Sequence, residues 1–391
     1  MAAAVLVAAC SGASVGSPPP RASLTTGASA VAAEPSGTLR SPVASVDPIG
    51  DLEHGPFTTG CVDQAYTTPL LDAKTDGRQL IWSSGANHAP DAAPDLFVAE
   101  PGGSIPPRVA FDNPNRDSQL MSLVGNGGSI AFVELNVRLF GDGGWRLWLL
   151  NPDRPAPLTI DTSDRAPGAG SPLPMPSMNG TDLVWTAVHK ISGGLRYELL
   201  DYSISTGRTR VVASASATST EYWFPSLAQD GALVYATVEH HAAAPEFHIY
   251  LTNVRGARPV RLDPSGDVTT PAFNGSVVLW KQVNQNVFNA GLLERYDLAT
   301  RSVTPIWFGR QVSVNYPSAG TRFGAVWGDD YKDFEIVDLA SGRPIVVQRW
   351  PATYPFDIAR PQITRNLMVY VVGPYDPAEG HLWLCWARLP G

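Results

Sequence analysis

An apolar triplet that ends in an aromatic residue recurs seven times along the 391-residue chain, and this repeat constrains the fold more than any other feature. The final aromatics are spaced 50, 53, 50, 45, 47 and 43 residues apart: Trp82, Phe132, Trp185, Tyr235, Trp280, Trp327 and Tyr370. Such a period is typical of arrays in which each repeat is one supersecondary unit that must stack on its neighbours.

Each repeat also carries the signals of short strands and tight turns. A Pro followed by small or apolar residues stands nine or ten positions before most of the aromatics, at Pro176, Pro225, Pro271, Pro317 and Pro361. Between Pro and triplet lie Asn-Gly or Asp-Gly pairs, which favour hairpins, at positions 126, 179, 230 and 274. Two further apolar stretches follow most triplets.

Four short antiparallel strands per repeat predict an all-β fold, a seven-bladed β-propeller of four-stranded antiparallel blades. Each blade has two apolar faces, so the ring must close. The seventh repeat reaches Gly391 without a fourth strand, while residues 52–59 occupy a fourth-strand position ahead of the first repeat. We therefore expect the N-terminal strand to complete the last blade.

This closure would bring two cysteines from the ends of the folded region together. Cys61 follows the N-terminal strand, and Cys385 lies in the strand expected to pair with it. A disulfide between them would lock the ring, and two buried free thiols are the alternative. An even pair at the two ends of an exported domain favours the disulfide.

The N-terminus indicates export. Residues 7–10 read Val-Ala-Ala-Cys and resemble a bacterial lipobox, which predicts lipidation of Cys10. The apolar stretch covers only residues 2–9 with no preceding basic residue, so a chance Ala/Val run stays open as an alternative. Residues 11–50 carry four charged and no aromatic residues, which predicts a disordered tether before a propeller at 51–391. We expect a protein anchored to the outer face of the cytoplasmic membrane, or held in the periplasm or cell wall.

The repeat texture resembles the TolB-like β-propellers of bacterial envelopes over about residues 52–391. It is carried by Pro225-Ser226, Asn179-Gly180, Val184-Trp185, Tyr296-Asp297-Leu298 and Thr206-Gly207. The resemblance implies a propeller in the cell envelope and says little about its ligand. The TolB propeller has six blades, whereas seven repeats are present here.

Composition and motifs exclude several function classes. The net charge is −8 and no basic stripe is present, so we expect no nucleic-acid partner. The sequence contains no phosphate loop, dinucleotide fingerprint or H-E-x-x-H motif, and we expect no catalytic residue, metal or cofactor. We expect a monomer that contacts the membrane through its lipid anchor alone.

The candidate site lies at the channel mouth, where we place the loops that lead into first strands. These segments carry aromatic, amide and charged residues: Tyr222, Trp223, Asn315, Tyr316, Asp357 and Arg360. Such a mixture suits an envelope protein, a peptide or a glycan, and predicts a non-catalytic binding or scaffold protein.

The alternative is a polysaccharide lyase or glycosidase with its site at the same mouth. It requires several histidines, or two carboxylates, to converge on the loops between second and third strands. The histidines placed on those loops are His88, His189, His240, His241 and His381.

Overall fold

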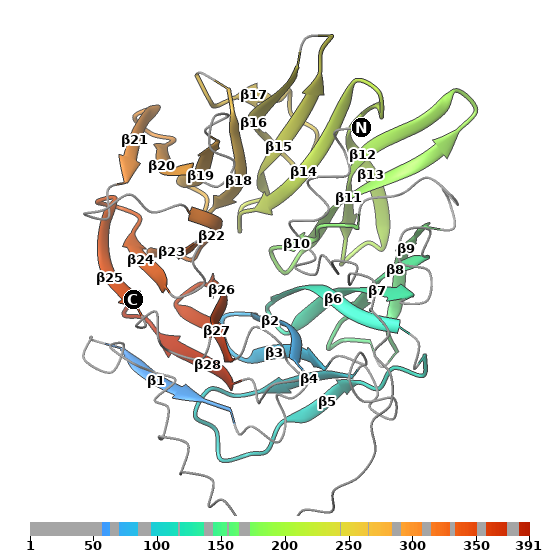
Figure 1. Ribbon diagram of the computed structural model, residues 1–391. Helices are drawn as coiled ribbons and strands as arrows, with labels where there is room; N and C mark the ends of the chain where they lie inside the picture. The colour runs from blue at the N-terminus through green and yellow to red at the C-terminus, as the bar shows by residue number, and fades with distance from the viewer. Residues whose placement is uncertain are drawn as a thin grey trace, which may run out of the picture. The chain divides into compact units, whose positions relative to one another are not determined.

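The computed structural model describes most of the repeat region and its strands (Figure 1). The described residues are 57–62, 70–84, 95–115, 118–136, 144–154, 156–163, 173–242, 244–264, 266–283, 291–306, 314–328, 333–349, 357–373 and 383–391. The expected lipobox with Cys10 and the expected tether at 11–50 lie outside them. No helix among the described residues is long and apolar enough to cross a membrane.

The described residues form 28 strands in seven four-stranded antiparallel sheets, which confirms the predicted fold class. Blade 1 contains β2 (Leu70–Thr75), β3 (Leu80–Ser84), β4 (Leu96–Ala99) and β5 (Arg108–Phe111). Blade 2 contains β6 (Ser118–Asn126), β7 (Ser129–Asn136), β8 (Trp145–Leu150) and β9 (Leu158–Thr162). Blade 3 contains β10 (Ser177–Met178), β11 (Asp182–Ile191), β12 (Gly194–Ser203) and β13 (Arg208–Ser216).

The later blades follow the same order. Blade 4 contains β14 (Thr220–Leu227), β15 (Ala232–His240), β16 (Pro245–Asn253) and β17 (Val260–Arg261). Blade 5 contains β18 (Val268–Phe273), β19 (Val277–Val283), β20 (Gly291–Asp297) and β21 (Ser302–Ile306). Blade 6 contains β22 (Val314–Ala319), β23 (Phe323–Gly328), β24 (Asp333–Asp338) and β25 (Arg343–Arg349). Blade 7 contains β26 (Asp357–Thr364), β27 (Leu367–Gly373), β28 (Trp383–Arg388) and β1 (Thr58–Cys61).

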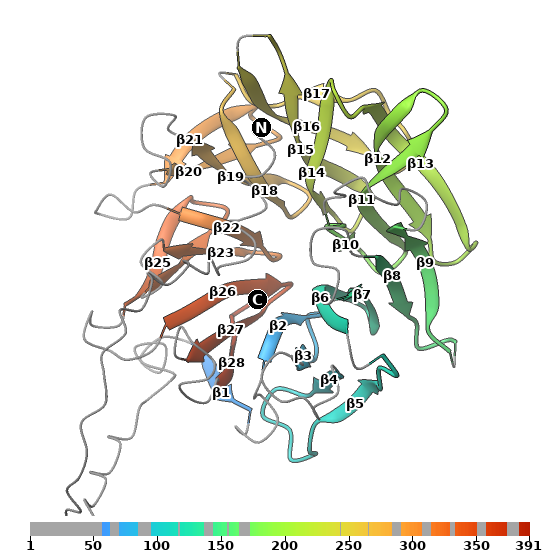
Figure 2. The ribbon, with the colours of Figure 1, turned by 45° about the vertical axis from the view of Figure 1, so that its right-hand side comes forward.

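The ring is closed in two ways. The first strands contact one another in the order β2, β6, β10, β14, β18, β22 and β26, and β26 contacts β2 (Figure 2). Blade 7 is completed by β1, which pairs with β28 as the sequence predicts. A disulfide joins Cys61 to Cys385 across this pair, so the alternative of two free thiols is wrong.

The repeated aromatics form the core between blades. Trp82, Trp185, Trp280 and Phe132 lie on second strands and are completely buried. Indole nitrogens need a partner inside a core. Trp185 Nε1 donates to Asp161 Oδ2 at 2.9 Å, and Trp280 Nε1 donates to Glu294 Oε2 at 2.7 Å.

The Ser that follows the repeated Pro links neighbouring blades. The backbone N–H of Leu227 donates to Ser177 Oγ at 2.9 Å, and that of Phe273 donates to Ser226 Oγ at 2.9 Å. The bond recurs between Ile363 N–H and Ser318 Oγ at 3.0 Å. These bonds give backbone N–H groups of the inner strands an acceptor, and they link blade 3 to blade 4, blade 4 to blade 5 and blade 6 to blade 7.

The turns between first and second strands also join blades. In the Asn179-Gly180 turn, Asn179 Oδ1 accepts from the N–H groups of Thr181 and Asp182, while its Nδ2 donates to Ala228 O of blade 4 at 3.0 Å. Gly180 has φ +93°, which explains the Asn-Gly pair. The side chain therefore closes its own hairpin and contacts the next blade.

Candidate functional site

The six predicted site residues lie on three of the blades' first strands. These first strands contact one another around the centre of the ring, and we call them the channel strands. Tyr222 and Trp223 belong to β14, Asn315 and Tyr316 to β22, and Asp357 and Arg360 to β26. We predicted that they lie on loops that lead into first strands, and this placement is wrong because β14, β22 and β26 begin three to five residues before Pro225, Pro317 and Pro361. The residues are therefore distributed over blades 4, 6 and 7.

The described side chains among these six differ in exposure. Tyr222 is 8% exposed and Trp223 is 9% exposed, so both pack mainly inside the ring. Trp223 Nε1 donates to Glu221 Oε2 at 2.8 Å, and the Tyr222 ring meets Tyr235 edge-on at 5.8 Å between centroids. Tyr316 is partly exposed. The side chains of Asn315, Asp357 and Arg360 lie outside the described part of the structure.

The channel strands share a β-bulge whose backbone is unusual. In β14, Trp223 pairs with Ala236 and Ser226 pairs with Val234, so β14 has one more residue between these two pairs than β15 has. The strands β6, β18, β22 and β26 contain the same extra residue. The bulges contain residues other than glycine with positive φ: Ser122 (51°), Phe224 (48°), Thr270 (49°) and Tyr316 (43°). For bulky or β-branched residues this conformation is strained, and such strain clusters at functional sites.

The bulges bring two aromatic rings together from blades that are not neighbours. Phe224 of blade 4 meets Tyr316 of blade 6 edge-on, with centroids 6.3 Å apart, although blade 5 lies between their strands. Contact across an intervening blade is possible only if both rings project toward the channel. Trp223 and Trp327 extend the set on either side, at 6.0 Å from Phe224 and 6.4 Å from Tyr316. We call Trp223, Phe224, Tyr316 and Trp327 the aromatic cluster.

Thr270 occupies the equivalent bulge of the blade between these two rings. Its hydroxyl oxygen is buried and has no hydrogen-bond partner among the described atoms. A buried hydroxyl without a partner costs free energy, which a polar group brought to it would relieve. Thr270 was not predicted as a site residue, and Phe224 was noted only as part of the segment that carries Tyr222 and Trp223. The signal for both was their position directly before a repeated Pro.

A second group of polar residues lies on blades 2 and 3 around His189. His189 was expected on a loop but belongs to β11 and is buried. Its Nδ1 is hydrogen-bonded to Glu198, and its Nε2 lies 3.5 Å from Asp161 Oδ2. The nearby Asp161 carboxylate and then the hydrogen bond to Glu198 raise the pKa of His189, although burial acts in the opposite direction. Burial raises the pKa of Asp161, but the nearby His189 ring and the hydrogen bond from Trp185 outweigh it and hold that pKa low.

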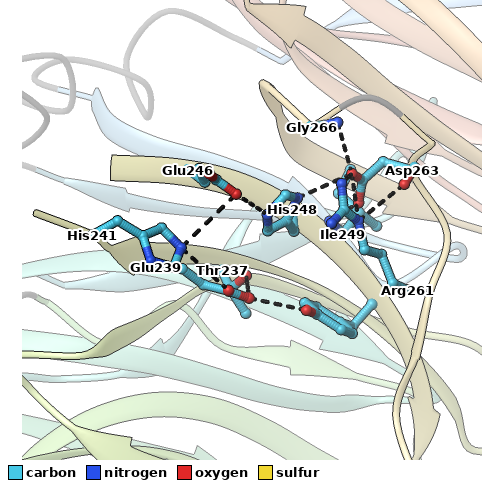
Figure 3. Close-up of polar contacts among 10 residues, drawn as sticks. Thr237, Glu239, His241, Glu246, His248, Ile249, Arg261, Asp263 and Gly266 are labelled. Atoms are coloured by element: carbon cyan, nitrogen blue, oxygen red, sulfur yellow. Dashed lines mark hydrogen bonds and ion pairs between the residues drawn. The ribbon is translucent and has the colours of Figure 1, made fainter. Parts of the chain in front are cut away.

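Blade 4 carries a similar arrangement (Figure 3). His248 is 3% exposed and lies between two carboxylates, with Nδ1 3.1 Å from Asp263 Oδ2 and Nε2 3.1 Å from Glu246 Oε2. Asp263 also accepts from the Ile249 N–H and pairs with Arg261 at 3.0 Å. Asp263 therefore connects β16, through His248 and Ile249, to Arg261 of β17.

The two remaining described histidines also lie near carboxylates, and His241 shares Glu246 with His248. His240, which lies in β15 and not on a loop, has Nε2 2.9 Å from Glu221 Oε1. His241 Nε2 lies 3.9 Å from Glu239 and 3.8 Å from Glu246. No group of three His, Cys, Asp or Glu side chains in the described part of the chain could hold a metal ion. His88 and His381, which the enzyme alternative also invokes, lie outside that part.

Comparison with known proteins shows the fold. No protein-family model matches the chain, and no curated relative matches its sequence. An oligogalacturonate lyase in complex with manganese superposes with a TM-score of 0.55 at 13% identity, covering 86% of this chain and 97% of that chain. The β-propeller domain of the trilobed protease from Pyrococcus furiosus gives 0.57 at 11% identity, with 82% and 94% covered. TolB from Acinetobacter baumannii gives 0.43 at 12% identity, with 86% and 81% covered.

Proposed function

We propose that this chain is a non-catalytic binding protein of the cell envelope, which holds a protein, peptide or glycan ligand at the channel through the aromatic cluster. The observation that carries the proposal is the contact between Phe224 and Tyr316 across blade 5. Partly exposed aromatic rings beside a hydroxyl without a partner offer a ligand both an apolar surface and a polar contact.

Rigidity of the scaffold supports a binding role. The blades are joined by the Ser Oγ bonds, by the Asn179 turn and by the Cys61–Cys385 disulfide. A site built on such strands is preorganised, which reduces the entropy lost when a ligand binds. The positive φ values of Phe224 and Tyr316 also indicate preorganisation, because the propeller holds both residues in a backbone conformation that an isolated strand would not adopt.

The proposed location is outside the cytoplasm, with a lipid on Cys10 as the anchor. Disulfides persist in oxidising compartments and are rare in the cytosol, so the Cys61–Cys385 bond supports export. Mass spectrometry of the mature protein tests this proposal. An acylated N-terminal Cys10 supports the anchor, and an unmodified Met1 contradicts it.

The fold by itself does not decide the activity, since structures of this shape include a lyase and a protease domain. The binding proposal is tested with an array of purified envelope glycans and overlapping envelope peptides, probed with the full chain. We expect at least one class to bind, and a Phe224→Ser/Tyr316→Ser double variant to bind it at least tenfold more weakly. Phe111→Ser, an equally partly buried ring on the outer strand β5, is the control that should bind normally. Equal binding by the double variant would place the ligand elsewhere.

A further inference from the structure

The outer strand of blade 3 differs from the outer strands of the other blades. We propose that the free edge of β13 (Arg208–Ser216) docks an extended acidic peptide segment of a partner protein, which adds to the blade as a fifth strand. This surface lies at the rim of the ring and does not depend on the function proposed for the channel. The three observations that carry the proposal are the length of the edge, its lack of proline and lysine, and its charge.

The first observation is length. β13 has nine residues and ends the strand order β10-β11-β12-β13, so no described strand pairs with its outer edge (Figure 2). The outer strands β1, β5, β9, β17 and β21 have two to five residues, and β25 has seven. A nine-residue edge offers enough backbone N–H and C=O groups for a stable additional strand.

The second observation is the composition of the edge. Proteins commonly protect free edges with short strands, Pro, charged side chains (above all Lys) or β-bulges. β21 and β25 contain Pro305 and Pro344, whereas β13 reads Arg-Thr-Arg-Val-Val-Ala-Ser-Ala-Ser, without Pro, Lys or an acidic residue. Its two arginines lie at one end, and a bulge at Val212 interrupts the pairing with β12, but residues 208–211 and 213–216 stay paired on either side of it. Val211 is 52% exposed, so the middle of the edge remains open to an added strand.

The third observation is charge. The protein carries a net charge of −8, yet the exposed charged residues of β13 are both arginines. Arg208 on β13 and Arg196 on the neighbouring strand β12 are exposed, and neither forms an ion pair within the described part of the chain. Arg210 Nε binds the buried Asp201 at 2.7 Å while its side chain remains 46% exposed. The edge therefore presents positive charge with no nearby exposed carboxylate on β13, which complements an acidic segment.

The pairing geometry specifies the peptide. Every described ladder in the propeller is antiparallel, so an added strand should run opposite to β13. Arg208 and Arg210 are two positions apart and lie on one face of the sheet. Two acidic residues separated by one position, near the C-terminal end of the peptide, would face them. Small or β-branched residues would fit opposite Val212–Ser216.

The experiment uses the full chain and an N-terminally fluorescein-labelled peptide, Thr-Val-Thr-Val-Thr-Glu-Thr-Glu. Fluorescence anisotropy measures its affinity for the wild type, for Arg208→Glu and for Arg343→Glu. Arg343 is the matched control because it is an exposed arginine at the start of another outer strand, β25. A second peptide carries Lys in place of both Glu residues. Two further peptides are N-methylated, one at the odd-numbered and one at the even-numbered residues. Because alternate N–H groups of a strand point to the same side, one of these two peptides loses the N–H groups that would bond to β13.

We expect saturable binding to the wild type and to Arg343→Glu, and at least tenfold weaker binding to Arg208→Glu. The Lys peptide and one of the two N-methylated peptides should also bind at least tenfold more weakly. The proposal is overturned if the Glu peptide does not bind, if the Lys peptide binds equally well, or if neither N-methylation matters. Sedimentation velocity that shows a dimer lost in Arg208→Glu would also overturn it, because the occupant of the edge would then be a second copy of this chain.

Discussion

Cys61 and Cys385 lie directly opposite each other in the β1–β28 pair, with their Cα atoms 4.0 Å apart and their positions separated by 324 in sequence. The bond thus joins the first described strand to the last at the point where the ring closes. By loop entropy, a cross-link over so long a segment contributes up to about 4–5 kcal/mol by constraining the unfolded chain.

We predict that a Cys61→Ser/Cys385→Ser variant unfolds at clearly lower denaturant concentration than the wild type, with a free energy of unfolding lower by about 2–4 kcal/mol. Chemical denaturation followed by tryptophan fluorescence measures this change. Cys10→Ser leaves the Cys61–Cys385 disulfide intact, so this variant should unfold like the wild type. If the double variant and Cys10→Ser unfold together, β1 would be held by its backbone pairing alone.

The sequence predicts the repeat architecture well because the architecture depends on periodic apolar residues and turn pairs. The spacing of Trp82, Trp185 and Trp280 identifies the second strands, and the missing fourth strand before Gly391 predicts the closure by β1. These features follow from hydrophobic patterning, which one sequence shows directly.

The candidate site was harder to predict because it depends on a backbone irregularity. The first strand of each repeat was predicted to lie around the repeated Pro, so the residues before Pro225 and Pro317 were predicted to lie on loops. In the structure these prolines lie within the bulges of the first strands. The ladder is already interrupted there, so the N–H that Pro lacks is not needed for a hydrogen bond. Nothing in the spacing of the repeats predicts that Phe224 and Tyr316, which lie on blades separated by another blade, are in contact.

His189 makes stability depend on pH. Its pKa in the folded protein is raised by the nearby Asp161 carboxylate and then by the hydrogen bond to Glu198. Its contribution is therefore fully present below its unfolded pKa of about 6.5 and is lost as pH rises through the folded value. Asp161, whose pKa is lowered, acts in the opposite sense and loses its contribution only in acid.

We predict that His189→Gln lowers the free energy of unfolding by about 1–2 kcal/mol near pH 5.5, and by clearly less near pH 9. Urea denaturation at the two pH values measures the difference. His241→Gln is the control, because its ring is half exposed and lies 3.8 Å or more from its carboxylates. A cost for His189→Gln that is the same at both pH values would show that the ring contributes through packing and not through charge.

The Ser226–Phe273 bond should contribute to stability as a link between blades 4 and 5. Ser226→Ala leaves the Phe273 N–H without its acceptor, and an unsatisfied buried donor costs about 1–3 kcal/mol. We expect a loss of that size in denaturant unfolding, together with faster amide exchange at Phe273. Ser214→Ala on the exposed edge of β13 should change stability by less than about 0.5 kcal/mol. A loss no larger than this control would mean that water satisfies the Phe273 N–H.

Thr270 combines two unfavourable features, a β-branched side chain at φ +49° and a buried hydroxyl without a partner. Thr270→Gly removes both, at the cost of about 1 kcal/mol for the more flexible unfolded chain. Relief of the left-handed conformation is worth about 1–2 kcal/mol and relief of the unpaired hydroxyl a similar amount. We therefore predict a net stabilisation of about 1 kcal/mol, measured by thermal and denaturant unfolding. Thr269→Gly, one residue earlier and without positive φ, should instead destabilise the protein by about 1 kcal/mol. If both substitutions destabilise equally, the bulge is not strained, and the case for a preorganised site at the channel weakens with it.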